Sequence, residues 1–514
     1  MDSSPHPENS NLAWVLVNNA HAYLNSDAVV SGSRRITYAE LLGNIGQIKD
    51  YLTERDIQKG ARVALYLANS PEYIALYYGV LAAGGTVVPL NTGAKSRDIK
   101  NWVGHSESDW FFFDAGNKEA RAAIPDVGEN VRCVAIGGSS SVENGWFDCI
   151  ETITAEGNSS VDVVDTDERD IAMIIYTSGT TGRPKGVSLT HGNLKSNYDA
   201  IIIGLALSMS DRVLNVLPFY YSYGNSVLNT HLLTGGCLVL ENSMMYPQLI
   251  VDKFDQENIT GFYGVPSTYA ILLRRTKLKE ANFALFRFMA QAGGPMPPAH
   301  VNELKQLIGD TDFYVMYGQT EASARLTILD AGKLDEKLGS IGMAIDGVSI
   351  EVRDKNGQSV ASGVTGEICA YGKNIMPGYW RDEPLTNSVL AAGWLYTGDL
   401  AHTDDEGFLY IDGRASDMIK SGANRISPKE IEEVIAELQG VAEVTVVGLP
   451  DELMGEVIKA FIVLAPDTEL DQRMIQSYCL KNLANYKVPK QISFIEELPK
   501  TQSGKVKRYL LKEY

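Results

Sequence analysis

Apolar runs alternate with amphipathic stretches along most of the chain. Residues 62–69 are mainly apolar and predict a strand, which is followed by Ser70 as a helix N-cap and by Pro71 at the first helical position. Gly84 ends this helix, and the apolar segment 86–90 predicts a second strand. Because similar strand–helix–strand units recur further along, the pattern predicts an α/β fold with parallel or mixed sheets.

The pattern changes twice in the second half of the chain. Residues 339–410 carry short strands separated by Gly and Asp turns, which predicts a small β-rich subdomain. A boundary follows at 411–422, and beyond it Ser427 is expected to cap a helix that Pro428 opens. Glu430 is expected to complete a capping box with Ser427.

These patterns predict an organisation in two domains of unequal size. We expect a large N-terminal domain of stacked α/β subdomains with mixed sheets plus the small β-rich subdomain, over residues 1–412. Residues 413–416 would form a hinge, and residues 417–514 a small α+β C-terminal domain.

Composition narrows the class of protein. The 514 residues exceed what a single hydrophobic core usually holds, and a net charge of −19 argues against nucleic-acid binding. The five cysteines are dispersed without a CxxC pair, which is typical of reduced, buried thiols. Residues 1–10 show no secretory signal, and the longest apolar stretch, 200–207, is too short to span a membrane. We therefore expect a cytoplasmic protein.

The segment 173–193 joins an aliphatic strand to a loop that is rich in small hydrogen-bond donors and also contains Lys185. Glycines let a backbone approach a phosphate, hydroxyl groups donate hydrogen bonds, and a lysine supplies charge. The loop is not a Walker motif, because no Gly-Lys-Ser/Thr triplet occurs. The residues after Lys185 predict a strand, so the loop is expected to link two strands. On composition alone, a polar surface loop that binds nothing is the alternative.

The order of residues in this loop favours the binding loop. The stretch "YTSGTTGRPKG" (176–186) resembles the phosphate-binding signature of the adenylate-forming superfamily, which includes acyl-CoA synthetases, peptide-synthetase adenylation domains and beetle luciferase. Further segments resemble motifs of that superfamily in the same order: "TYAELL" (37–42), "AGGPM" (292–296), "YGQTE" (317–321), "YTGDL" (396–400), "DGR" ending at 414 and "PKTQSGKVKR" (499–508). The resemblance covers nearly the whole chain from about residue 28.

The resemblance implies a site for ATP. The triphosphate would be held by Thr177, Ser178, Gly179, Thr180, Thr181, Gly182 and Lys185. The adenine would be lined by Gly293, Gly294, Tyr317 and Gly318. Thr320 would contact the α-phosphate, and Glu321 would help to hold Mg²⁺, a cation that prefers oxygen ligands. Asp399 would accept hydrogen bonds from the ribose hydroxyls, with help from Arg414.

The resemblance also implies a catalytic lysine and a mobile C-terminal domain. Lys505 would bridge the carboxylate and the α-phosphate, whereas its neighbours Lys507 and Arg508 are expected to lie in solvent. The small domain would rotate about the hinge between two half-reactions, although Ser416 stands where Asp or Lys is more usual. After rotation the segment ending at Arg425 would face the site; Arg425 would contact phosphates or lie on the surface, and both remain open.

The acyl pocket departs from the superfamily pattern. Tyr221, in "LPFYYSYGNS", occupies the position of a histidine that normally borders the pocket. The same segment lacks the Asp that pairs with the ammonium group of an α-amino acid, and an unpaired buried ammonium is costly. Tyr263 and Gly264 are expected to form another wall. Apolar and aromatic lining favours a fatty or aryl acid, although these rings could simply pack the core.

The leading hypothesis is an AMP-forming acyl-CoA synthetase that uses ATP, Mg²⁺ and CoA. The alternative is a stand-alone adenylation enzyme that loads the phosphopantetheine arm of an acyl carrier protein. Luciferase-like or amide-forming enzymes share every adenylation residue and are less favoured. An inactive binding module would be expected to lose Lys505, Glu321 or Asp399, which are all present.

Overall fold

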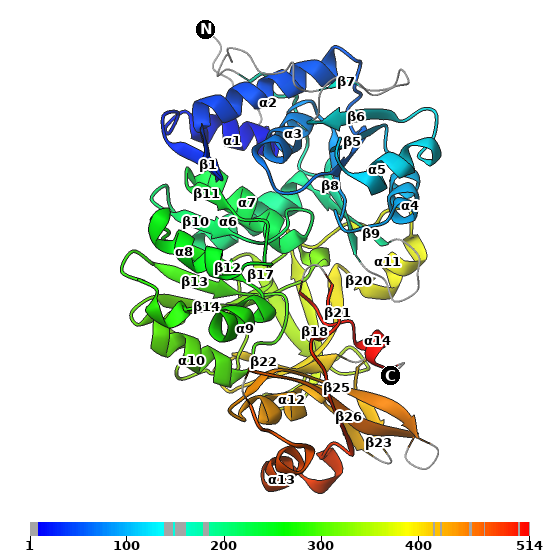
Figure 1. Ribbon diagram of the computed structural model, residues 1–514. Coiled ribbons are helices and arrows are strands. Elements are labelled where there is room, and N and C mark those ends of the chain that lie inside the picture. The colour runs from blue at the N-terminus through cyan, green and yellow to red at the C-terminus, as the bar shows by residue number, and fades with distance from the viewer. Residues whose placement is uncertain are drawn as a thin grey trace.

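The computed structural model describes residues 9–137, 148–149, 161–177, 185–414, 417–421, 424–451, 455–466, 468–501 and 504–512. Two large mixed sheets dominate this part of the chain (Figure 1). The nine-stranded sheet has the order β16 (Met343–Ala344), β15 (Thr327–Leu329), β14 (Asp312–Tyr317), β13 (Phe288–Gln291), β12 (Gly261–Gly264), β10 (Arg212–Asn215), β11 (Cys237–Leu240), β1 (Asp27–Ser31) and β2 (Arg34–Thr37). The eight-stranded sheet has the order β19 (Gly378–Tyr379), β9 (Lys185–Thr190), β8 (Ile171–Thr177), β4 (Thr86–Pro89), β3 (Arg62–Tyr66), β5 (Trp110–Asp114), β6 (Arg132–Ile136) and β7 (Asp148–Cys149). The predicted α/β class is confirmed.

The helices form layers between and outside these sheets. The main hydrophobic core lies between the two sheets and contains residues from α1 (Leu12–Ala20), α2 (Tyr38–Thr53), α3 (Pro71–Ala82), α6 (His191–Gly204) and α7 (Ser222–Thr234). Outer helices cover the other faces: α4 (Ser96–Ser106) and α5 (Lys118–Ala123) on the eight-stranded sheet, and α8 (Gln248–Gln256), α9 (Pro266–Arg275) and α10 (Pro298–Ile308) on the nine-stranded sheet. In β5, Trp110 and Phe112 face the inner core while Phe111 and Phe113 face the outer one, as the strand period of two requires. The helix predicted after Ser70 is confirmed, because Ser70 Oγ accepts a hydrogen bond from the Tyr73 amide.

Two smaller sheets complete the fold. The predicted β-rich subdomain is confirmed as a five-stranded sheet of β17 (Val348–Arg353), β18 (Gly366–Gly372), β21 (Trp394–Thr403), β20 (Leu390–Ala391) and β22 (Leu409–Arg414), with α11 (Glu383–Val389) nearby. A second five-stranded sheet contains β24 (Asn424–Ile426), β23 (Ile419–Ser421), β26 (Gly455–Leu464), β25 (Val441–Asp451) and β27 (Gln491–Phe494). Its own core includes side chains of α12 (Pro428–Ala436) and α13 (Gln472–Asn482), and the chain then continues to α14 (Arg508–Leu511). This last unit, orange to red, lies at the bottom of Figure 1.

Two sequence expectations for the C-terminal part are wrong. Helix α12 begins at Pro428 as predicted, but Ser427 makes no capping hydrogen bond because its hydroxyl donates to the Asp412 carbonyl. Glu430 instead accepts hydrogen bonds from Lys487. Arg508 is not a solvated charge either, since it donates to the Val446 carbonyl and pairs with Glu432.

The described cysteines follow the expectation of buried, reduced thiols. Cys133, Cys237, Cys369 and Cys479 are buried and free. Among the helices that the structure describes, none is both long and apolar enough to cross a bilayer. The predicted hinge and domain boundaries stay predictions, and the hinge residues 415 and 416 lie outside the described chain.

Candidate active site

Three neighbouring parallel strands end at one edge of the nine-stranded sheet. In the register of the sheet, Gly264 at the end of β12 lies beside Gln291 at the end of β13, and Gln291 lies beside Val315 of β14. Adjacent strand ends therefore lead into three predicted parts of the site: the wall of the acyl pocket with Gly264, the loop with Gly293, and the "YGQTE" segment. Carboxyl ends of parallel strands are the usual place for a ligand in open α/β sheets.

An acidic group at this edge is held by two side chains that come from different sheets. Asp399 on β21 is buried, and its carboxylate accepts hydrogen bonds from the Tyr317 hydroxyl at 2.7 Å and from Arg414 Nε at 2.7 Å. The β21–β22 register places Asp399 directly opposite Arg414. The Asp399 carboxylate raises the pKa of Arg414, and burial together with Asp399 raises the pKa of Tyr317 well above its ordinary value. The structure thus brings together Tyr317, Asp399 and Arg414, as the sequence predicts.

The "YGQTE" segment turns sharply after β14. A Cβ on Gly318 would lie 2.0 Å from the Ala324 carbonyl oxygen, so only glycine fits here, and the turn (Thr320–Ala322) is a short 3₁₀ helix, η4. This path projects Thr320 towards α7, where its hydroxyl lies 3.1 Å from Ser222 Oγ. Residues Ser323 and Ala324 that close the loop have positive φ angles of 58° and 110°, a strained conformation for side-chain-bearing residues.

Glu321 has one carboxylate oxygen engaged and one available. Its Oε1 accepts a hydrogen bond of 2.8 Å from the Tyr379 hydroxyl on β19. No donor among the described residues lies within hydrogen-bond distance of Oε2. No group of three His, Cys, Asp or Glu side chains that could hold a metal occurs in the described part of the chain. Glu321 therefore fits a cation that is bound by one carboxylate and completed by phosphate oxygens and water, as Mg²⁺ often is.

The C-terminal tail reaches this edge from more than a hundred residues away. Three described residues of the tail, Thr501, Gly504 and Lys505, are joined by backbone hydrogen bonds and are called the tail turn. The Thr501 amide donates to the Lys505 carbonyl at 2.7 Å, and the Gly504 amide donates to the Thr501 carbonyl at 2.9 Å. A Cβ on Gly504, whose φ is +80°, would lie 2.6 Å from Ser267 Oγ and 2.7 Å from Val265 Cγ2. The turn is therefore seated on the junction between β12 and α9, where only glycine approaches so closely.

Lys505 projects from this turn into the charged site. Its side chain keeps exposed surface, yet removal of water around the ammonium and the nearby Arg414 lower its pKa. Asp399 and Glu321 act on the same ammonium in the opposite direction. Lys505 thus lies in the field of three residues that the sequence predicts for the nucleotide and its Mg²⁺, and it forms no tight ion pair within the described chain.

The predicted triphosphate loop is only partly described. Thr177 ends β8, Lys185 begins β9, and the two residues are partners in an antiparallel pair. The expectation that this loop links two strands is therefore confirmed, and the next helix, α6, begins at His191 after Thr190 as N-cap. Ser178, Gly179, Thr180, Thr181 and Gly182 lie outside the described residues.

The residues predicted for the acyl pocket lie at different depths. Tyr221 immediately precedes α7, and its hydroxyl accepts a hydrogen bond of 3.3 Å from Asn91. Tyr263 is 1% exposed, with its ring packed among Tyr223, His231 and Phe288. Gly264 lies behind the ring of Tyr269, and its role and that of Tyr263 as pocket walls stay predictions.

Sequence reasoning missed three residues of this region. Ser222, which contacts Thr320, follows directly after Tyr221 in the segment already singled out. Tyr379 contacts Glu321 from a distant strand and carries no local signal. Arg325 is a lone basic residue in the apolar run after "YGQTE", and that contrast is a signal that could have been used.

Comparison with known proteins gives two family matches. The AMP-binding enzyme family model matches residues 16–380, and the AMP-binding enzyme C-terminal domain model matches residues 430–505. Similar proteins include a feruloyl-CoA synthase of Amycolatopsis sp, which is 32% identical over 94% of both chains. An indoleacetate–CoA ligase of Aromatoleum aromaticum is 30% identical over 92% of both chains.

Solved structures resemble the whole chain. ATP-bound MatB from Rhodopseudomonas palustris has a TM-score of 0.88 and 30% identity over 98% of both chains. The o-succinylbenzoate-CoA synthetase of Bacillus subtilis, solved with its acyl-adenylate intermediate, has a TM-score of 0.84 and 26% identity over 97% of this chain and 98% of the other.

Proposed function

The chain belongs to the AMP-binding enzyme family, and on that basis we propose a catalytic role for its site residues. The chain is an AMP-forming acid–thiol ligase of the acyl-CoA synthetase type. It activates a carboxylic acid with ATP to an acyl-adenylate and then transfers the acyl group to the thiol of CoA. We further propose a role for each site residue, a bound metal ion and a class of carboxylic acid.

In the first half-reaction a carboxylate oxygen attacks the α-phosphorus, and the bond to pyrophosphate breaks. Both reactants are anions, so the protein must place them in line and neutralise charge. Lys505 is assigned to the carboxylate and the α-phosphate, Thr320 to the α-phosphate, and Lys185 to the departing pyrophosphate. The observation that carries this assignment is the position of Lys505 near Asp399 and Glu321, at the edge where β12, β13 and β14 end.

The nucleotide is assigned to groups that are already positioned in the structure. Asp399 would receive the ribose hydroxyls, and the hydrogen bonds from Tyr317 and Arg414 fix its carboxylate in place. Glu321, through its available oxygen, would hold Mg²⁺, which supplies positive charge to the phosphates.

In the second half-reaction the CoA thiol attacks the acyl carbonyl and AMP leaves. Gly504 of the tail turn is packed against the junction of β12 and α9, so this segment would have to withdraw for a thiol to approach from that side. We infer that the unit after the predicted hinge 413–416 rotates between the two steps. The acyl acceptor is CoA, and a carrier protein's phosphopantetheine arm is the alternative that the experiment below distinguishes.

The acid is an aryl or fatty carboxylic acid in this proposal. The names of similar proteins include ferulate and indoleacetate ligases, and the region next to Tyr221 is rich in aromatic rings. The test is exchange of labelled pyrophosphate into ATP with a panel of acids, followed by mass spectrometry of the product formed with CoA alone or carrier protein alone. Exchange with at least one acid and a CoA thioester are expected. No exchange with any acid would overturn the proposal.

A further inference from the structure

Arg325 is a large charged side chain in the interior of the protein. It follows the "YGQTE" loop by four residues and is 1% exposed. Its guanidinium lies over the ring of Tyr223, with its central carbon 4.6 Å from the ring centroid. A buried guanidinium is normally paired with a carboxylate, because removal of an isolated charge from water is costly.

Arg325 has no such partner. Within the described chain no carboxylate forms an ion pair with it. Its side-chain hydrogen bonds are long, at 3.4 Å to the Ala324 carbonyl and 3.5 Å to Ser226 Oγ, and its Nε has no acceptor. Loss of water is the main cause that lowers the pKa of Arg325, with only Tyr223 and Tyr263 opposing it.

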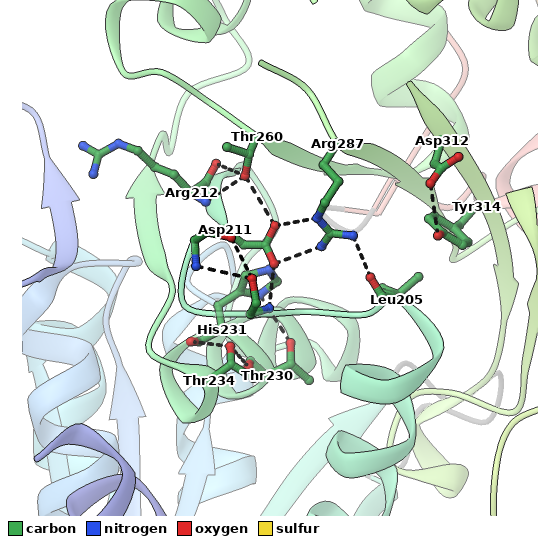
Figure 2. A network of polar contacts seen from close by, with 12 residues as sticks. Leu205, Asp211, Arg212, Thr230, His231, Thr234, Thr260, Arg287, Asp312 and Tyr314 are labelled. Atoms are coloured by element: carbon green, nitrogen blue, oxygen red, sulfur yellow. Dashed lines mark hydrogen bonds and ion pairs between the residues drawn. The ribbon is translucent and has the colours of Figure 1, made fainter. Parts of the chain in front are cut away.

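Other arginines of the chain are satisfied by acids. Arg287 donates to both oxygens of buried Asp211 at 2.9 Å, and Figure 2 shows the two side chains facing each other. Further arginines that pair with acids are Arg212 with Glu257, Arg274 with Glu303 and Arg508 with Glu432. The missing acid at Arg325 is therefore a local exception.

A second unpaired group lies beside Arg325. It belongs to Tyr263, and we call Tyr223, Tyr263 and Arg325 together the Arg325 cluster. The hydroxyl of Tyr263 is buried and has no hydrogen-bond partner. The ring of Tyr263 packs edge-on against Tyr223, the ring that also carries the Arg325 guanidinium. Two buried groups able to donate a hydrogen bond, Arg325 Nε and Tyr263 Oη, thus lack acceptors, and native interiors rarely leave such groups unpaired.

The cluster is connected to the reacting centre by α7. Ser222 at the start of α7 contacts Thr320, and the hydroxyl of Ser226, one turn later, accepts a long hydrogen bond of 3.5 Å from Arg325. Residues four apart on a helix are about 6 Å from each other. Arg325 therefore lies roughly one helical turn inward from the point where the acid would meet the α-phosphate.

We propose that Arg325, with the Tyr263 hydroxyl, is a specificity-determining subsite for a second anionic group on the acid, so that the preferred substrate is a short dicarboxylic acid. One carboxylate reacts near Thr320, and the other receives the guanidinium. The proposal rests on the two half-reactions of the proposed function and changes one part of it, the acid: a short dicarboxylic acid takes the place of the aryl or fatty monocarboxylic acid. It accounts for a cation without an acid: the missing partner is supplied by the substrate.

The cluster is closed in this structure, since Arg325 and Tyr263 are each 1% exposed. Substrate entry therefore requires a rearrangement of side chains around Tyr223, of a kind that is common on ligand binding. A site built to pair with a buried charge also rejects acids that leave the charge unpaired. The enzyme should therefore distinguish a dicarboxylic acid from a monocarboxylic acid of the same length.

The experiment compares acids of equal length in pyrophosphate exchange: glutarate with pentanoate, and adipate with hexanoate. The unmodified enzyme is expected to have a kcat/KM at least tenfold higher for a dicarboxylate than for its monocarboxylate match. Arg325→Met is expected to lose at least a hundredfold on dicarboxylates and to change less than about threefold on monocarboxylates. Arg325→Lys, which keeps the charge, is expected to recover part of the dicarboxylate activity.

The matched control is Arg353→Met, because Arg353 also lies over a ring, that of Trp394, but pairs with Glu351. This variant is expected to keep the substrate preference. Preference of the unmodified enzyme for monocarboxylates would overturn the subsite, whether or not Arg325→Met folds, and would leave the proposed function intact. Equal loss on both classes in folded Arg325→Met would also overturn it. Absence of exchange with every acid would instead remove the proposed function itself.

Discussion

Arg287 and Arg325 show two ways in which this chain places an arginine inside the fold. Arg287 is half-buried, holds both oxygens of Asp211 and also donates to the Leu205 carbonyl at 2.9 Å (Figure 2). Arg325 is buried more deeply and meets only a tyrosine ring, a serine hydroxyl and a backbone carbonyl. A carboxylate thus pairs with the partly solvated Arg287, whereas no carboxylate of the described chain pairs with the fully buried Arg325, where removal of the charge from water costs most.

This difference separates a structural role from a ligand-binding role. A paired arginine contributes to the folded state, and removal of either partner leaves a buried charge uncompensated. A buried arginine without a carboxylate partner lowers the stability of the folded protein. Its presence is explained when a bound ligand supplies the missing carboxylate. Substitutions at the two positions are therefore expected to act on different properties.

The largest expected effect is on stability at Arg287. Arg287→Met leaves Asp211 buried and unpaired, and is expected to lower the free energy of unfolding by about 3–5 kcal/mol. Arg325→Met removes an uncompensated charge and is expected to change it by less than about 1 kcal/mol. Chemical denaturation of both variants measures this. A larger loss for Arg325→Met than for Arg287→Met would break the comparison.

A third cation, Lys505, is expected to affect rate without affecting stability. Lys505→Ala is expected to lower acyl-adenylate formation by about 10²- to 10³-fold, as removal of a group that stabilises transition-state charge does. Thioester formation from supplied acyl-adenylate should be retained. Because the pKa of Lys505 is lowered, the adenylation rate should fall, as pH rises, at a lower pH than for an ordinary lysine. Equal loss of both half-reactions would contradict this role, and Lys507→Ala serves as the control.

The region of Arg287 is also expected to respond to acid, through His231, whose ring packs against Tyr263 as well. Burial lowers the pKa of His231, which lies near Asp211, from its ordinary value of 6.5 to about 4. Its contribution to stability is complete above about pH 6.5 and is lost as pH falls towards 4, which amounts to at most roughly 3 kcal/mol. His231→Leu should reduce this acid-induced loss in denaturation curves, whereas exposed His21→Gln should not. An unchanged pH dependence in His231→Leu would refute the assignment.

The smallest expected effect distinguishes two buried tyrosines. The Tyr269 hydroxyl donates to the Ala290 carbonyl at 2.8 Å, so Tyr269→Phe should cost about 1 kcal/mol of stability. The Tyr263 hydroxyl is unpaired, so Tyr263→Phe should be neutral or stabilising by about 1 kcal/mol. In the same variant kcat/KM for glutarate should fall about threefold to tenfold. A destabilised Tyr263→Phe with unchanged activity would mean that the hydroxyl belongs to the core alone.

Local sequence signals predicted the elements that have local causes. Ser70 and Pro71 predict the start of α3, and the aliphatic run before the Gly-rich loop predicts β8. Tyr317, Asp399 and Lys505 were assigned through motif order, and the structure brings them to one edge. The order of the motifs was informative because all of them are proposed to contact the same nucleotide.

The failures have tertiary causes. Ser427 has the sequence of a cap, but the Asp412 carbonyl of a neighbouring strand end takes its hydroxyl. Arg508 looks like a solvated tail residue until Glu432 and the Val446 carbonyl are placed beside it. Arg325 went unnoticed because its significance lies in a missing partner, which a sequence does not display.

The tight turn at Gly318 has an evolutionary consequence. Residues 317–325 carry the groups proposed for adenine, phosphate and metal at one end and Arg325 at the other, on a path fixed by the close approach of Gly318 to Ala324. Lengthening or shortening this loop to suit another acid would shift Thr320 and Glu321 at the same time. Descendants of such an enzyme should therefore acquire new acid preferences through exchanges on α7, at positions such as Ser226, while this loop keeps its length.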